Sequence, residues 1–185
     1  MSKTSSTLMM VGLAVAGLAS GYVFNNWQHQ QKLSATKVMP SDDNQVVSNV
    51  RPLFKLKDIE DKIRDVKEWD GKVLMINFWA TWCPPCRKEM PAFIEIQEKY
   101  QDKGFTIIGI ALDEKQAVIN FTDPMGMNYP ILMAEQEGIK LTKAYGNKLG
   151  VLPFTVIVDR KGNITHRQRT ELTFEQVEGM IKPLL

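Results

Sequence analysis

The sequence contains few cysteines and histidines, and it has no strong excess of charge of either sign. Its 185 residues include only two cysteines and two histidines, and the formal net charge is +2. A structural zinc site needs about four Cys or His ligands, and His29 and His166 lie far apart in the sequence. We therefore expect no metal, no cofactor and no nucleic-acid partner.

The chain also lacks internal repeats and low-complexity tracts. Its hydrophobic content of 44 % and charged content of 24 % are those of an ordinary globular protein. The length allows one domain with additional segments.

The N-terminal part contains one long uncharged, mostly apolar run, residues 8–24, preceded by Lys3. Its 17 residues lie between the length of a signal-peptide core and that of a minimal membrane span. Trp27 follows the run, at the position of an interfacial anchor. We expect an uncleaved signal anchor, with a signal peptide cleaved after Ala19 as the alternative; either way the rest is exported.

Four segments follow from this interpretation. They are a short N-terminal segment (1–7), a signal anchor or transmembrane helix (8–24), a polar tether (25–49) and a folded domain (50–185).

The two cysteines lie within the segment Trp82-Cys83-Pro84-Pro85-Cys86. The apolar run 72–78 precedes them and predicts a buried strand, whereas an amphipathic helical pattern follows them. A Cys-x-x-Cys pair between a strand and a helix is typical of a redox-active dithiol. A purely structural disulfide is the alternative, but such a short loop would stabilise the fold little.

The spacing predicts that Cys83 caps the N-terminus of the helix. Its sulfur could then accept a hydrogen bond from the N–H of Cys86, and the helix dipole would favour a thiolate there. Pro84 and Pro85 would occupy the first turn, where their missing N–H groups break no helical bond. Cys86 would be the more deeply buried thiol.

The remaining pattern predicts an α/β domain whose central strands pair in parallel. Phe54–Asp58 and Ile63–Trp69 indicate a short hairpin or extension. The predicted strands are 73–79, 105–112, 130–133, 154–159 and 163–167, and the predicted helices are 85–102, 115–122 (closed by Asp123-Pro124), 138–145 and one capped by Thr173 with Gln176.

Three segments, 77–91, 144–146 and 150–159, resemble the TlpA/ResA-type membrane-anchored thioredoxins. The resemblance covers residues 50–185. It implies an α/β thioredoxin-like fold, a mixed central sheet flanked by helices, with an N-terminal extension and a membrane anchor.

The resemblance also implies roles for individual residues. Cys83 would be the attacking thiol and Cys86 the resolving thiol. Pro153 would be a cis-proline facing both sulfurs, with an ordinary trans strand-start proline as the alternative. The substrate-binding residues would be Trp82, Pro84, Pro85, Leu152 and Pro153, with the Leu152 backbone pairing with an extended substrate.

Two positions depart from typical thioredoxins, because Asn77 and Gly109 stand where a buried Asp and a Lys are usual. Glu89 lies one helical turn after Cys86, as in the TlpA/ResA branch, and could accept its proton. The alternative is an exposed glutamate favoured by the helix dipole. The segment from Gly146 to Pro153 is also slightly longer than in many relatives, which affects the rim of the site.

The implied function is an exported thiol-disulfide oxidoreductase that reduces disulfides in cell-envelope proteins. The expected location is the cell inner membrane, single-pass, with the domain facing the periplasm or cell exterior. A membrane thiol transporter of the DsbD/CcdA type would donate electrons, and cytochrome c maturation or reduction of a copper-site protein would be the task. The alternatives are an envelope oxidase or isomerase, because no motif fixes the redox direction, and an anchored peptide-binding or metallochaperone module.

Overall fold

The computed structural model describes residues 49–135 and 137–185. The predicted N-terminal segment, the signal anchor and nearly all of the tether lie outside these residues, so the domain boundaries stay a prediction. Within the described ranges, no helix has the length and hydropathy needed to cross a membrane.

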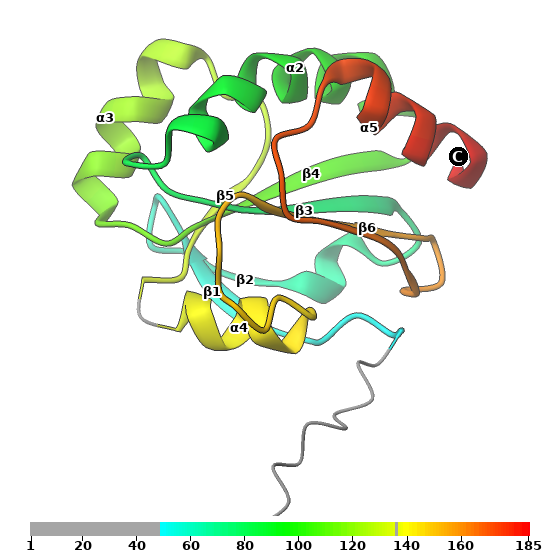
Figure 1. Ribbon diagram of the computed structural model, residues 1–185, viewed down its shortest axis with the longest axis horizontal. Helices are drawn as coiled ribbons and strands as arrows, with labels where there is room; N and C mark the ends of the chain where they lie inside the picture. Colours follow the sequence, from blue (N-terminus) through cyan, green and yellow to red (C-terminus); the bar gives the residue numbers. More distant parts are fainter. Residues whose placement is uncertain (1–48, 136) are drawn as a thin grey trace, which may run out of the picture. The chain divides into compact units, whose positions relative to one another are not determined.

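A seven-stranded mixed sheet forms the centre of the domain, in the order β2-β1-β5-β4-β3-β6-β7 (Figure 1). The strands are β1 (Lys55–Asp58), β2 (Ile63–Asp65), β3 (Val73–Trp79), β4 (Phe105–Ala111), β5 (Ile131–Met133), β6 (Phe154–Val158) and β7 (Ile164–Gln168). The helices are α2 (Pro84–Tyr100), α3 (Lys115–Met125), α4 (Gly138–Ala144) and α5 (Phe174–Ile181), with 3-10 turns η1 (Val66–Trp69), η2 (Gln101–Lys103) and η3 (Lys182–Leu184).

The two central strands confirm the prediction from their continuous apolar sequence. Every residue of β3 and β4 is buried, and the strands pair in parallel from Val73 opposite Phe105 to Trp79 opposite Ala111. Helix α2 connects them, so the cysteines follow the carboxyl end of β3. Ligand sites of open α/β sheets form at this end.

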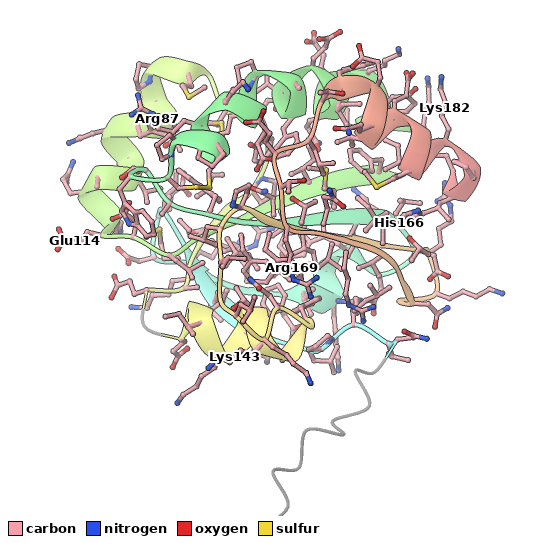
Figure 2. The ribbon with its side chains drawn as sticks, viewed as in Figure 1. Arg87, Glu114, Lys143, His166, Arg169 and Lys182 are labelled. Atoms are coloured by element: carbon pink, nitrogen blue, oxygen red, sulfur yellow. A yellow bond between two sulfur atoms is a disulfide. The ribbon has the colours of Figure 1, made fainter. Side chains whose placement is uncertain are left out.

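Helices cover both faces of the sheet. Helices α2, α3 and α5 lie on one face, and α4 lies on the other (Figure 1). Each face has its own core: Phe93, Val118 and Val177 belong to the first, and Trp69 and Tyr145 to the second. Charged side chains such as those of Arg87, Glu114, Lys143 and Lys182 are exposed around these layers (Figure 2).

The predicted N-terminal hairpin is present, since β1 and β2 pair antiparallel. The start of α5 is also confirmed, because Thr173 and Gln176 form a reciprocal capping box. The predicted end of α3 was wrong: the helix continues through Pro124 and ends at Gly126, whose φ of 64° is left-handed. A proline in the last turn removes only one helical bond, and glycine adopts the left-handed C-terminal position without strain.

Candidate active site

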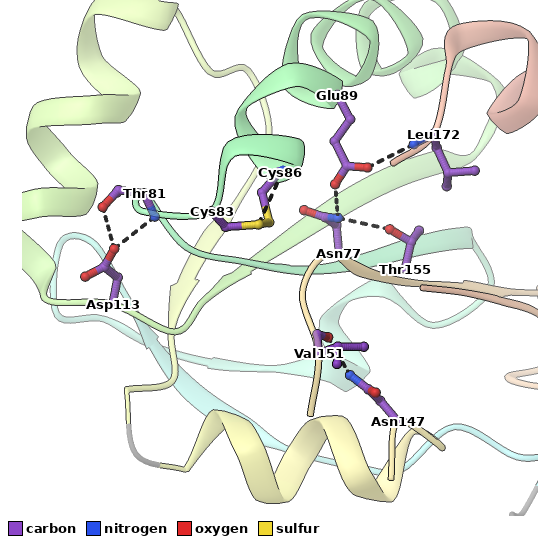
Figure 3. The surroundings of a disulfide bond; sticks show 10 residues. All are labelled: Asn77, Thr81, Cys83, Cys86, Glu89, Asp113, Asn147, Val151, Thr155 and Leu172. Atoms are coloured by element: carbon purple, nitrogen blue, oxygen red, sulfur yellow. Dashed lines mark hydrogen bonds between the residues drawn. A yellow bond between two sulfur atoms is a disulfide. The ribbon is translucent and has the colours of Figure 1, made fainter. Parts of the chain in front are cut away.

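The two cysteines form a disulfide at the N-terminus of α2 (Figure 3). Cys83 is the N-cap residue, and its sulfur accepts a hydrogen bond from the backbone N–H of Cys86 at 3.4 Å. This confirms the predicted capping geometry. Cys83 is 3 % exposed and Cys86 is fully buried, so Cys83 is the less deeply buried of the two, as predicted.

The residues around the cysteines differ strongly in exposure. Pro84 and Pro85 occupy the first turn of α2, where they were predicted. Trp82 is 66 % exposed, although it directly precedes the buried Cys83. A large apolar side chain is therefore left in solvent at the edge of the disulfide.

Glu89 is buried between α2 and the sheet, and is 2 % exposed. Its Oε1 accepts a hydrogen bond from Asn77 Nδ2 at 2.9 Å, and its Oε2 accepts one from the backbone N–H of Leu172 at 3.1 Å (Figure 3). The alternative of an exposed helix-start glutamate is therefore wrong.

Burial raises the pKa of Glu89 from the ordinary 4.5 to about 8. The hydrogen bonds from Asn77 and Leu172 act in the opposite direction, and the negative charge of Glu171 raises the pKa further. A carboxyl group with a pKa near neutrality can both accept and release a proton at physiological pH. Glu89 lies one helical turn after Cys86 on α2.

Asn77 connects the strand to this carboxyl group. Its Nδ2 also donates to Thr155 Oγ1 at 2.9 Å, so both amide protons are used. An asparagine cannot act as a base, but it can donate a hydrogen bond that stabilises the ionised Glu89. The titratable carboxyl group thus lies on the helix, whereas the strand contributes a neutral donor.

The peptide bond between Leu152 and Pro153 is cis, as the resemblance implied, and the trans alternative is wrong. Leu152 is half-buried and packs against the core cluster that contains both cysteines. Asn147 is fully buried and its Nδ2 donates to the carbonyl oxygen of Val151 at 2.8 Å. This bond fixes the loop that leads into Pro153.

The structure adds residues that the sequence did not indicate. Leu172, Thr155 and Asn147 contact the site from distant segments, and Asp113 accepts hydrogen bonds from the backbone and hydroxyl of Thr81 next to the cysteines (Figure 3). Thr155 lies inside the matched segment 150–159 and Asn147 directly follows the segment 144–146, whereas Leu172 and Asp113 carried no local signal.

No cluster of three or more His, Cys, Asp or Glu side chains occurs in residues 49–135 and 137–185. The chemistry that this geometry supports is thiol–disulfide exchange, with an outer nucleophile, an inner resolving thiol and a buried proton acceptor.

Comparison with known proteins gives the same class. The sequence model of the Redoxin family matches residues 45–181. The chain therefore belongs to the Redoxin family, and its fold is thioredoxin-like.

The relatives narrow this assignment. The chain is 39 % identical over 134 residues to the thiol-disulfide oxidoreductase ResA of Bacillus thuringiensis (strain Al Hakam), covering 72 % of this chain and 75 % of the relative. It is 30 % identical over 175 residues to ResA of Halalkalibacterium halodurans, with 92 % of each chain covered. A thioredoxin-family thiol:disulfide interchange protein from Chlorobium tepidum TLS has a TM-score of 0.67 and 28 % identity, covering 74 % of this chain and 96 % of its own. The protein is a thiol-disulfide oxidoreductase of the ResA/TlpA type.

Proposed function

We propose that this protein is an exported, membrane-anchored reductant of disulfides in cell-envelope proteins. Cytochrome c maturation, in which the thiols of an apocytochrome must be reduced before haem attachment, is its proposed task. The domain would face the periplasm or cell exterior, held by the apolar run 8–24.

The observation that carries the reductive direction is the modest stabilisation of the Cys83 sulfur. One backbone N–H, that of Cys86, donates to it at 3.4 Å. Pro84 and Pro85 occupy the next positions of the first turn and have no N–H to donate. Strong disulfide oxidants owe their potential to a stabilised reduced form. The Cys83 sulfur has few donors and a buried carboxyl group lies one turn beyond Cys86, so the reduced form is stabilised little. A less stable reduced form favours a reductant over an oxidant.

The proposed reaction transfers two electrons to the substrate. The Cys83 thiolate attacks a substrate disulfide, which forms a mixed disulfide and releases the first substrate thiolate. Cys86 then loses its proton to the Glu89 carboxylate and attacks the Cys83 sulfur. This step closes the Cys83–Cys86 disulfide and releases the second substrate thiolate, which takes up a proton.

Substrate contact is proposed along the loop before Pro153. An extended segment would pair with the Leu152 backbone and cover the exposed ring of Trp82. Val151, which is 42 % exposed, extends this rim. The additional residues between Gly146 and Pro153 would then contribute to substrate choice.

Each turnover leaves the protein oxidised, so it needs an electron source. A membrane thiol transporter of the DsbD/CcdA type would supply two electrons through a dithiol and so restore both thiols. This partner is proposed from the resemblance and from the need for reducing equivalents in an oxidising compartment.

The equilibrium reduction potential of the Cys83–Cys86 couple tests the direction. We expect a value well below that of strong oxidases, closer to about −200 to −270 mV than to about −120 mV. A potential near −120 mV would reverse the assignment and identify an oxidase or isomerase. In the same assay Cys83→Ser should abolish disulfide reduction, whereas Cys86→Ser should accumulate mixed disulfides.

A further inference from the structure

The segment between β3 and α2 is a tight turn that leads directly into the reactive cysteine. The backbone N–H of Cys83 donates to the carbonyl oxygen of Ala80 at 3.2 Å, so Thr81 and Trp82 are the two central residues of a β-turn. The ring of Trp82 is largely exposed and adds little that holds the turn in place. Contacts from elsewhere in the fold must therefore fix where this turn lies.

Asp113 supplies such a contact from the segment that follows β4. The strands β3 and β4 are in register at Trp79 and Ala111, and Thr81 and Asp113 each lie two residues further on. Asp113 Oδ2 accepts hydrogen bonds from the backbone N–H of Thr81, at 2.9 Å, and from the Thr81 hydroxyl (Figure 3). Both bonds reach the first central residue of the turn, so they fix its main chain and its side chain together.

The Asp113 carboxylate is itself held in place. Its Oδ1 accepts a hydrogen bond from the backbone N–H of Glu114 at 2.8 Å, next to the start of α3. Burial acts to raise the pKa of Asp113, but the hydrogen bonds from the Thr81 hydroxyl and from the backbone N–H groups of Glu114 and Thr81 outweigh it, so the pKa lies below its ordinary 3.8. The carboxylate is therefore ionised at neutral pH, and hydrogen bonds to an ionised acceptor are stronger than those between neutral groups.

We propose that Asp113 is a positioning residue for thiol–disulfide exchange, which fastens the turn 80–83 and so holds the Cys83 sulfur and the Trp82 ring where a substrate disulfide meets them. Asp113 would act only through this turn, because its carboxylate oxygens are engaged by Thr81 and Glu114. The anchor would matter for exchange in either redox direction, and only the part that concerns Trp82 rests on the proposed substrate contact.

The position of the Cys83 sulfur affects the reaction in two ways. Attack on a disulfide requires the sulfur to be aligned with the bond that breaks, so a small displacement slows the step. Cys83 is also the N-cap residue of α2, and its sulfur accepts from the Cys86 N–H at 3.4 Å. A loosened turn would weaken this bond, which stabilises the attacking thiolate.

Asp159 provides a matched control within the same fold. It also fastens a turn with both carboxylate oxygens: Oδ1 accepts from the backbone N–H groups of Lys161 and Asn163 at 2.9 and 2.8 Å, and Oδ2 accepts from Asn163 Nδ2 at 3.0 Å. This turn follows the end of β6 that pairs with the beginning of β3, whereas the cysteines follow the end of β3. Loss of either carboxylate removes three hydrogen bonds, but only Asp113 contacts the active-site turn.

Asp113→Ala tests the proposal in the reduced full-length protein. The initial rate at which Cys83 attacks the small uncharged probe dipyridyl disulfide should fall by about 3- to 10-fold, and KM for insulin reduction should rise by about 10-fold, because hydrogen bonds to a charged group are lost. Asp113→Asn removes the charge but retains an oxygen acceptor for Thr81, so it should not show these losses. Asp159→Ala should lower the stability to urea by a similar amount and leave the rate and KM within about twofold of the wild type.

Thr81 gives a second test in which the Asp113 carboxylate keeps its charge. Thr81→Val removes only the hydroxyl donor and should lower the rate with dipyridyl disulfide by about 2- to 4-fold, whereas Thr81→Ser keeps the donor and should restore the wild-type rate. Thr122→Val is the control of the same chemistry, since the Thr122 hydroxyl donates within α3, to the Val118 carbonyl oxygen at 3.0 Å. It should leave the rate unchanged.

A Trp82→Ala background shows whether Asp113 acts through the ring. There Asp113→Ala should raise KM for insulin little further, because the side chain that it positions is gone. The proposal is overturned if Asp113→Ala and Asp159→Ala change the rate with dipyridyl disulfide equally, or if Thr81→Ser is as slow as Thr81→Val. An unchanged KM in Trp82→Ala would overturn the Trp82 part together with the proposed substrate contact, while the Cys83 rates still decide the role of the anchor.

Discussion

The burial of Glu89 has a measurable consequence for the stability of the whole domain. Its pKa is about 8 in the folded protein against an ordinary 4.5, so between these values the native state binds more protons than the unfolded chain. The free energy of unfolding must then fall as the pH rises from about 4.5 to 8. At 1.36 kcal/mol per pKa unit, the loss contributed by this group reaches roughly 4–5 kcal/mol as an upper limit.

Glu89→Gln removes this dependence, because glutamine keeps the size of the protonated acid and does not titrate. The amide nitrogen of the variant would face the backbone N–H of Leu172, which costs about 1 kcal/mol. We therefore expect the variant to be as stable as the wild type or slightly less stable near pH 5. Near pH 9 it should be more stable by about 2–4 kcal/mol.

Urea unfolding of the oxidised protein at several pH values between 5 and 9 measures this difference. Glu98→Gln is the control, since Glu98 is an exposed glutamate of the same helix, and it should leave the slope nearly unchanged. Parallel pH profiles for the wild type and Glu89→Gln would refute the raised pKa. The same variant should slow the resolution of mixed disulfides by about 10²- to 10⁴-fold, and identical pH–rate profiles would remove Glu89 from the mechanism.

Three further predictions concern the surroundings of the site. Asn147→Ala removes the hydrogen bond to the Val151 carbonyl and should lower the free energy of unfolding in urea by about 1–3 kcal/mol. It should also raise KM for protein substrates more than it lowers kcat. An unchanged KM would show that this loop does not take part in substrate binding. Gly109→Ala would place a methyl group 2.8 Å from Ile131 Cδ1 and should destabilise the fold by about 1–3 kcal/mol; unchanged stability would contradict the close packing over Gly109. N-terminal sequencing of protein purified from cells should begin before residue 8, whereas a mature end near Ser20 would show that the signal is cleaved.

The central β-α-β unit was predictable because its information is local. The apolar runs of β3 and β4 and the Cys-Pro-Pro-Cys segment specify two buried strands and a capped helix without reference to distant residues. The end of α3 shows where local information fails. The Asp123-Pro124 pair indicated a stop, but Gly126 provides the left-handed residue at which the helix ends.

The proton-accepting part of the site was only partly predictable. The spacing of Cys86 and Glu89 placed the carboxyl group one turn from the thiol, but left open whether it faced the sheet or solvent. Contacts across 83 residues to Leu172 and 12 residues to Asn77 decide this, and no periodic pattern encodes them.

Asn77 stands where typical thioredoxins have a buried aspartate on the strand, so the buried carboxyl group of this site is that of Glu89 on α2. A carboxyl group on α2 shares one helical turn with Cys86, and its hydrogen bonds to Asn77 and Leu172 fix where it lies. The hydrogen bonds recorded for this carboxyl group come from neutral donors, Asn77 and the Leu172 backbone, and neither balances a full negative charge. The ionised form is therefore costly, and that cost keeps the pKa close to neutral, as the proposed proton transfer from Cys86 requires. A cation in place of these donors would stabilise the ionised carboxylate, which would stabilise the fold at neutral pH and make the carboxylate a weaker base. The loss of stability above pH 5 and the proposed proton transfer therefore have the same physical origin, the cost of ionising a buried carboxyl group.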